Sequence, residues 1–221
     1  ECKAAAVETI GIHGGDGTLH LTLTKLIHVY GGERLPRIAF LRGGTQNTIA
    51  RSCDVTTTAE HMLDYVLRAS ERNALVEIER DIIRVGPRPP HDLASVRAEE
   101  REDVYGFIFG NGFVNQFLVE YYSRGEPSEW NAVRTLVAGC ASVAVKGEIA
   151  KRLFRRFEGR VIVDGALWPA QSFTGVVAST IEQVGLGFRP FVRCNERPHS
   201  FHLLGITAGA MGFALELPKI R

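Results

Sequence analysis

The sequence has few cysteines, almost no net charge and no long hydrophobic run. Its 221 residues include four cysteines, none in a CxxC spacing, which argues against a disulfide framework and a zinc site. A net charge of +1 argues against a chain-wide nucleic-acid-binding surface, which needs a clear basic excess. The most apolar stretch, residues 136–145, is shorter than the about 20 residues of a transmembrane helix. With no signal-peptide pattern at its start, we expect a cytoplasmic protein with no nucleic-acid partner, and any contact that it makes with lipid would be at the membrane surface.

The bulk composition is that of a protein with a substantial hydrophobic core. Hydrophobic residues make up 45% and charged residues 23% of the chain, which are ordinary values for globular domains. The length predicts one or two domains. The first residues lack an initiating Met and lead almost directly into a strand pattern, so we expect the N-terminal part of the first domain to be missing.

Strand and helix patterns alternate through residues 1–73. The apolar spacing predicts a strand at 7–13, a helix at 19–29, a strand at 38–41, a helix from Thr48 and a helix at 58–71. Thr57 and Glu60 have the spacing of a capping box at the start of the last helix. This alternation is typical of a parallel α/β sheet.

The pattern changes after residue 73, where we place a domain boundary. Strands are predicted at 74–85, 104–109, 160–163, 172–180 and 201–206, and helices at 113–122, 131–157 and 209–217, with breaks at Gly139 and Gly147. Three prolines in residues 86–92 and a charge run at 97–103 predict an exposed loop. Residues 74–221 are therefore predicted to form a second domain rich in β-structure.

A glycine-rich segment follows each of the first two strands, Gly14-Gly15-Asp16-Gly17-Thr18 and then residues 43–47. A strand that turns through glycines into a helix points several backbone N–H groups the same way, and the helix N-terminus adds partial positive charge, so phosphate binds there. Asp16 would repel phosphate unless Mg²⁺ lies between them or the carboxylate orients a hydroxyl. The alternative is a plain turn with Asp16 as helix N-cap, and spacing alone does not separate the two.

The first segment resembles the GGDGT signature shared by diacylglycerol kinases, sphingosine kinases and NAD kinases. The second, residues 44–51 (GTQNTIAR), is similar to the G-T-x-N-D-x-A-R segment of diacylglycerol kinases and related lipid kinases, whereas NAD kinases carry an Asn-Glu pair there. The resemblance covers most of the chain, but its specific motifs lie only within residues 14–51.

This resemblance implies an incomplete Rossmann-like nucleotide-binding α/β domain (1–73) followed by a β-sandwich domain (74–221), with the active site in the cleft between them. It implies ATP as phosphoryl donor, Mg²⁺ as cofactor and a lipid alcohol at a membrane surface as acceptor, diacylglycerol first, with a homodimer left open. Asp16 would be catalytic and hold the metal. The residues implied to bind the nucleotide are Gly14, Gly15, Asp16, Gly17, Thr18, Gly44, Thr45 and Asn47.

The sequence departs from the family pattern at three places. One is just after the first glycine segment, where His20 and Leu21 stand in place of the family's Asn and Glu. Thr48 stands where the family usually has Asp, which removes a charge that helps to place metal or water. The Asp-Gly-Glu segment that carries the family's catalytic base has no match, since Asp164-Gly165 comes too early and predicts a turn; we expect the base beyond Arg221. A catalytically inactive nucleotide- or lipid-binding regulatory protein, and a soluble-substrate kinase of the NAD kinase type, are the alternatives.

Two further features have ordinary structural interpretations. His199 and His202 lie three apart in a strand pattern and would face opposite sides, so we do not expect a metal pair. The basic residues within 151–160 are predicted to be the solvated face of a helix with a buried stripe, rather than a surface for anionic lipid.

Overall fold

A computed structural model of the chain describes residues 1–86, 102–123, 128–144, 147–185 and 187–216. They form two compact units, unit 1 (Glu1–Phe107) and unit 2 (Ile108–Arg221). The predicted domain boundary near residue 73 stays a prediction. Within the described ranges, no helix combines the length and the hydrophobicity needed to cross a bilayer.

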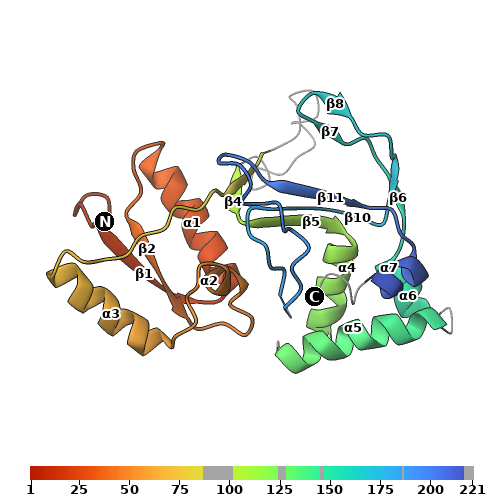
Figure 1. The fold of residues 1–221 in the computed structure, drawn as a ribbon, viewed down its shortest axis with the longest axis horizontal. Coiled ribbons are helices and arrows are strands. Elements are labelled where there is room, and N and C mark those ends of the chain that lie inside the picture. The colour runs from red at the N-terminus through yellow and green to blue at the C-terminus, as the bar shows by residue number, and fades with distance from the viewer. Residues whose placement is uncertain (87–101, 124–127, 145–146, 186, 217–221) are drawn as a thin grey trace. The chain divides into compact units, whose positions relative to one another are not determined.

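Unit 1 is built on a parallel pair of strands, as the alternating pattern predicted (Figure 1). Its elements are β1 (Thr9–Gly14), α1 (Asp16–Tyr30), β2 (Arg37–Arg42), α2 (Thr48–Ser52), α3 (Ala59–Glu71), β3 (Ile83–Val85) and β4 (Val104–Gly106). α1 buries Leu19 and Leu23 in the core of the unit. It ends at Gly31, whose φ of 58° is left-handed and favours glycine.

The start of α3 differs by one residue from the prediction. Thr58, and not Thr57, is the N-cap, and its hydroxyl accepts a hydrogen bond from the backbone N–H of His61 at 3.4 Å. Glu60 is therefore in the first turn, where its own backbone N–H and then the Thr58 hydroxyl hold the pKa of the carboxyl below its usual value. The capping-box pattern indicated the helix start but not the capping residue.

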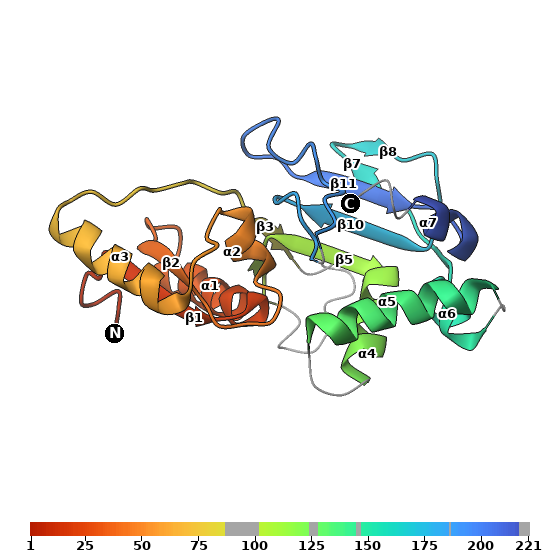
Figure 2. The same cartoon turned by 60° about the horizontal axis from the view of Figure 1, so that its bottom comes forward.

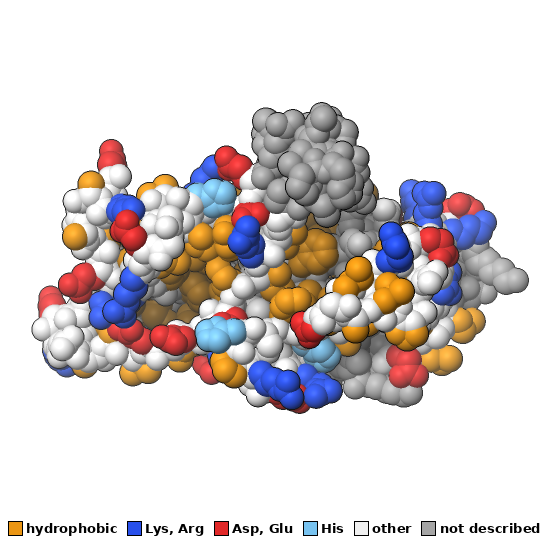
Figure 3. Space-filling model, turned by 90° about the horizontal axis from the view of Figure 1, so that it is seen from above, with side chains coloured by type: hydrophobic (Ala, Val, Ile, Leu, Met, Phe, Trp, Pro, Cys, Tyr) orange, Lys and Arg blue, Asp and Glu red, His pale blue; other side chains and the backbone are white. Residues whose placement is uncertain are grey.

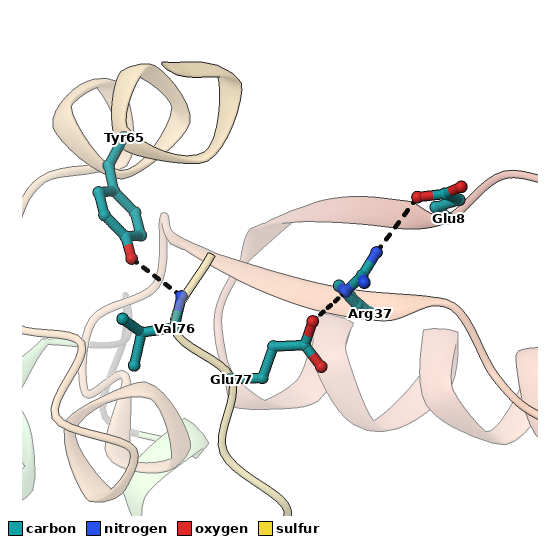
Figure 4. Close-up of polar contacts among 5 residues, drawn as sticks. All are labelled: Glu8, Arg37, Tyr65, Val76 and Glu77. Carbon is teal, nitrogen blue, oxygen red and sulfur yellow. Dashed lines mark hydrogen bonds and ion pairs between the residues drawn. The ribbon is translucent and has the colours of Figure 1, made fainter. Parts of the chain in front are cut away.

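The chain after α3 is mostly extended without strand pairing, so the predicted strands at 74–85 reduce to β3. Figure 4 shows how side chains hold this segment. The Tyr65 hydroxyl accepts a hydrogen bond from the backbone N–H of Val76 at 3.2 Å, and Arg37 pairs with both Glu77 and Glu8. The predicted loop at 86–92 and 97–103 lies largely outside the described residues.

One face of α1 binds the backbone of β4. The Thr24 hydroxyl accepts the Tyr105 N–H at 3.0 Å and donates to the Tyr105 carbonyl at 3.2 Å. His20 donates from Nδ1 to the same carbonyl, and His28 donates from Nε2 to the Asp103 carbonyl, both at 2.7 Å. Since these α1 residues are spaced four apart, they lie on one side of the helix. β4 also pairs antiparallel with β3.

Unit 2 centres on a three-stranded antiparallel sheet in the order β11-β10-β5. Its elements are β5 (Ile108–Gly112), α4 (Phe113–Ser123), α5 (Glu129–Ala144), α6 (Glu148–Leu153), β6 (Phe157–Glu158), β7 (Ile162–Val163), β8 (Ala166–Leu167), β9 (Ser172–Phe173), β10 (Gly175–Ser179), β11 (His202–Ile206) and α7 (Ala210–Glu216). Val177, Phe191 and Cys194 form a buried cluster against this sheet. The mixed fold with antiparallel strands in its second part agrees with the predicted class, whereas the β-sandwich stays a prediction.

Several predicted elements of unit 2 are corrected in detail. The strand expected at 104–109 is two strands, β4 and β5, interrupted at Phe107. The long helix breaks at Gly147, which is the N-cap of α6, but α5 continues through Gly139. Asp164 and Gly165 form the expected turn between β7 and β8, with φ of 50° and 81°, the left-handed values of a two-residue hairpin loop.

The structure also shows the surroundings of the basic stretch at 151–160 and of the second histidine of the pair. α6 buries Leu153 and exposes Lys151 and Arg152, so the basic residues do form a solvated face. His202 lies on β11, with its ring edge against Phe191. Both units also expose hydrophobic side chains, and Figure 3 shows a face on which such side chains lie among charged ones.

Candidate functional site

The parallel pairing of β1 and β2 places the two glycine segments next to each other. Gly14 at the end of β1 is in register with Arg42 at the end of β2. The Gly43 N–H donates a hydrogen bond to the Gly14 carbonyl at 3.0 Å, which continues the ladder into the loops. The predicted segments therefore leave the same edge of the sheet, which is where ligands bind in open α/β folds.

Close backbone packing between the segments explains most of the glycines. A Cβ on Gly44 would lie 2.3 Å from Gly15 Cα, and one on Gly15 would lie 3.0 Å from Gly44 Cα. A Cβ on Gly14 would lie 2.6 Å from the Thr18 side chain. Glycine is thus required here by loop-to-loop and loop-to-helix contacts, independently of any ligand.

Gly17 is the exception in the first segment, because a Cβ there would meet no atom within 4 Å. It lies exposed in the first turn of α1, next to exposed Thr18. The segment predicted as a glycine loop is therefore partly helical, with Asp16, Gly17 and Thr18 forming the first turn. The open space at Gly17 leaves room for a ligand at this helix end.

Asn47 shapes the second segment. It is buried and has a left-handed backbone with φ of 48°. Its side-chain oxygen accepts the Gly44 N–H at 3.0 Å, and its amide nitrogen donates to the Gly44 carbonyl. Although Asn47 occupies the N-cap position of α2, its side chain makes no capping hydrogen bond to that helix.

Asp16, rather than Asn47, accepts the capping hydrogen bonds from the N-terminus of α2. Its carboxylate oxygens accept the backbone N–H of Thr48 at 3.0 Å and of Ile49 at 2.9 Å. The alternative that Asp16 is the N-cap of α1 is wrong, because that position is Gly15, which offers no side chain. Asp16 instead caps a different helix, α2, whose first turn contains no acidic residue.

The result is an N-terminus of α1 without a side-chain cap. The helix has 15 residues, so its dipole is well developed, and its first N–H groups have no partner inside the helix. The one acidic side chain of the first turn is directed to α2. This helix end is therefore suited to receive an anion.

A small pocket lies at the junction of the segments, with about 250 Å³ of empty space including open solvent. Its lining includes four of the predicted residues, Gly14, Gly15, Asp16 and Asn47. Thr45 is exposed at the second segment, outside this lining. The lining also contains Arg42, which the sequence analysis missed and whose guanidinium donates to the carbonyls of Thr56 and Thr57. A basic residue directly before the second glycine segment was the available signal.

A divalent cation would find few protein ligands here. No group of three or more His, Cys, Asp or Glu side chains suited to a metal occurs among the described residues. Within the described part of the chain, Asp16 is the only carboxylate in the pocket lining, and both of its oxygens already accept a backbone hydrogen bond. Mg²⁺ in phosphoryl transfer commonly has one or two carboxylates plus substrate phosphates as ligands, so Asp16 fits such a site only together with a bound nucleotide.

Comparison with known proteins agrees with the resemblance predicted from the glycine segments. Residues 1–77 match the family model of the diacylglycerol kinase catalytic domain. No curated protein matches the sequence.

The fold of the whole chain is similar to that of solved bacterial proteins. A candidate diacylglycerol kinase from Bacillus anthracis str. Sterne matches with a TM-score of 0.62 and 16% identity, over 99% of this chain and 62% of that chain. A diacylglycerol kinase from the same strain matches with a TM-score of 0.59 and 16% identity, over 99% and 61% of the two chains. At these identities the likeness shows the fold, and this chain spans about 62% of the length of the structures that it matches.

Proposed function

We propose that this protein is a lipid kinase that transfers the γ-phosphoryl group of ATP to a lipid hydroxyl, with diacylglycerol as the first candidate substrate. The observation that carries the proposal is the uncapped N-terminus of α1 beside a second glycine segment, in a region that matches the diacylglycerol kinase catalytic domain. The exposed first turn gives the phosphates access to the amides of Gly17 and Thr18.

In this proposal the second segment, with Gly44, Thr45 and Asn47, lies on the nucleotide side of the site. Mg²⁺ would neutralise charge on the transferring phosphoryl group. Asp16 lines the pocket beside the first turn of α1, and it acts either on the metal or by orienting the groups around it. Because transfer to a hydroxyl needs positioning and charge neutralisation more than covalent chemistry, a rigid pair of glycine segments serves the reaction.

Unit 2 supports the lipid half of the proposal. α4 and α5 contact each other (Figure 2), and the exposed side chains described on them include no carboxylate. Most of them are large and hydrophobic: Leu118, Val119, Tyr122, Trp130, Val133 and Val137. Arg134 is exposed on the same face of α5 as Trp130, while small Ala132 and Thr135 are buried. Aromatic and aliphatic groups beside a cation suit the surface of an anionic bilayer.

The test is phosphoryl transfer from labelled ATP to diacylglycerol in mixed micelles by the full-length protein, with Mg²⁺ present. Lipid-dependent product formation supports the proposal, and ATP binding without transfer to diacylglycerol, a sphingoid base or another lipid alcohol refutes it. In parallel, Trp130→Ser and Val137→Ser should weaken sedimentation with anionic vesicles. Leu67→Ser is the control, because Leu67 on α3 is 59% exposed, close to the 60% of Val137.

A second candidate function, a nucleotide- or lipid-binding regulatory protein without catalysis, is favoured by Thr48. Its side chain is buried at the start of α2, where the family pattern has a carboxylate. Asp16 is then the only acidic side chain that the described residues contribute to the pocket lining. The transfer assay separates the two functions, since the regulatory protein binds ATP or lipid but forms no phosphorylated lipid.

A further inference from the structure

We infer that Asp16 is a positioning residue, which caps α2 from the first turn of α1 and so fixes the second glycine segment against the N-terminus of α1. The inference rests on the proposed function only for its effect on ATP. The cap itself follows from the two hydrogen bonds at 2.9 and 3.0 Å to the first backbone N–H groups of α2. With both oxygens engaged in the cap, Asp16 has the orienting role and is not a metal ligand.

The need for an external cap arises from Asn47. A left-handed residue whose side chain is closed onto Gly44 cannot turn that side chain toward α2. The backbone N–H groups of buried Thr48 and Ile49 would then lack an acceptor, and an unsatisfied buried donor is costly. A carboxylate is the strongest acceptor for such N–H groups, since its charge also interacts favourably with a helix N-terminus.

Two contacts show that this cap couples the two glycine segments. Asp16 immediately follows Gly15, and Gly15 packs directly on Gly44. The two glycine segments are therefore joined both by the Asp16 carboxylate and by the contact between the glycine backbones. Any loosening of the cap moves the second segment relative to the uncapped end of α1, which is where the phosphates are proposed to bind.

Thr48 is consistent with this arrangement. Its backbone nitrogen lies 3.0 Å from an Asp16 carboxylate oxygen, so an Asp side chain at position 48 would bring a second negative charge into the buried junction. Two close carboxylates repel unless a cation lies between them. With Thr at this position, the cap needs no cation.

The first experiment compares Asp16→Asn with Asp64→Asn by thermal unfolding in EDTA, without nucleotide. Asp16→Asn retains one acceptor at most and should lower the melting temperature of unit 1 by about 5 °C. Asp64→Asn is the matched control, because the interaction of Asp64 among the described residues is an exposed ion pair with Arg68 on α3. The melting temperature of Asp64→Asn should stay within about 1 °C of wild type.

The second measurement asks whether the cap positions the site. Well below its melting temperature, Asp16→Asn should weaken ATP binding by about tenfold, with an unchanged Mg²⁺ concentration for half-maximal activity. An unchanged melting temperature in EDTA with a raised Mg²⁺ requirement would make Asp16 a metal ligand and overturn the inference. A lowered melting temperature with unchanged ATP affinity would leave Asp16 a merely structural cap, which also overturns it.

The variant Thr48→Asp provides an independent test of the inference. We expect Mg²⁺ to raise the melting temperature of this variant by several degrees relative to EDTA, and to leave that of the wild type unchanged. Equal responses of the two proteins would contradict the inference. Because both melting experiments omit ATP and lipid, they decide the cap even if the protein transfers no phosphoryl group, and a failure of the proposed function is seen separately in the transfer assay.

Discussion

Gly17→Ala is the variant for which we expect stability and nucleotide binding to change in opposite directions. Gly17 lies in the first turn of the 15-residue helix α1, has no left-handed φ, and has no atom within 4 Å of a Cβ. Glycine costs up to about 1 kcal/mol relative to alanine within a helix. The new methyl therefore meets no steric penalty inside the protein, and we expect about 0.5 kcal/mol of stabilisation at this terminal position.

The same methyl projects into the space proposed for the nucleotide phosphates. A phosphate displaced from the amides of α1 loses charge-assisted hydrogen bonds of roughly 1.5–3 kcal/mol each. We therefore expect ATP affinity to fall by at least about tenfold, since 1.4 kcal/mol corresponds to one decade. A loss of affinity in a variant that is not destabilised separates ligand contact from folding.

The assay is a titration with ATP by calorimetry, paired with urea unfolding of the same samples. Gly209→Ala is the control, because a Cβ on Gly209 also meets no atom within 4 Å and the residue precedes α7 in unit 2. It should leave ATP affinity unchanged. If Gly17→Ala binds ATP as tightly as the wild type does, the phosphates do not lie at the first turn of α1 and the reasoning is refuted.

Three further predictions concern the frame of unit 1. Gly44→Ala places a Cβ 2.3 Å from Gly15 Cα and should cost about 1–3 kcal/mol of unfolding free energy in urea, and wild-type stability would contradict the close packing. Thr24→Val removes both hydrogen bonds to Tyr105 and should cost about 1–3 kcal/mol, whereas Thr24→Ser should recover most of it. The lowered pKa of Glu60 means that the folded state binds its proton less readily than the unfolded state, so stability falls as the pH drops below about 4.5. Glu60→Gln should flatten the dependence of unfolding free energy on pH between about 5 and 3, and an unaltered slope would contradict the assignment.

Local patterns predicted the elements around the site well. β1, α1, β2, α2 and α3 all begin within a few residues of the predicted positions, because apolar periodicity and glycines act over short stretches of chain. The capping of α2 was beyond these patterns. Asp16 and Thr48 are 32 residues apart, and only the register of the two parallel strands brings them together.

The same limit explains the errors elsewhere. Gly139 predicted a helix break, yet α5 continues through it. The reason for glycine at this position is steric, because a Cβ there would lie 2.8 Å from the Leu153 side chain. That glycine serves close packing between α5 and α6, which its sequence neighbours do not reveal. The strand pattern at 104–109 likewise gave no sign that β4 is held by α1 while β5 joins the sheet of unit 2.

The attachment of β4 to α1 has a consequence for the order in which unit 1 folds. Its hydrogen bonds join residues 75 to 85 positions apart, and closing a loop of that size costs about 4 kcal/mol of chain entropy. β1, α1 and β2 are local and can assemble early, whereas β4 docks only after the intervening chain has been synthesised, several seconds later at about 5–20 residues per second. Until then Thr24 and its histidine neighbours on α1 are hydrogen-bonded to water. Because this face of α1 is polar, the partly folded unit exposes no hydrophobic helix face at this position before β4 docks.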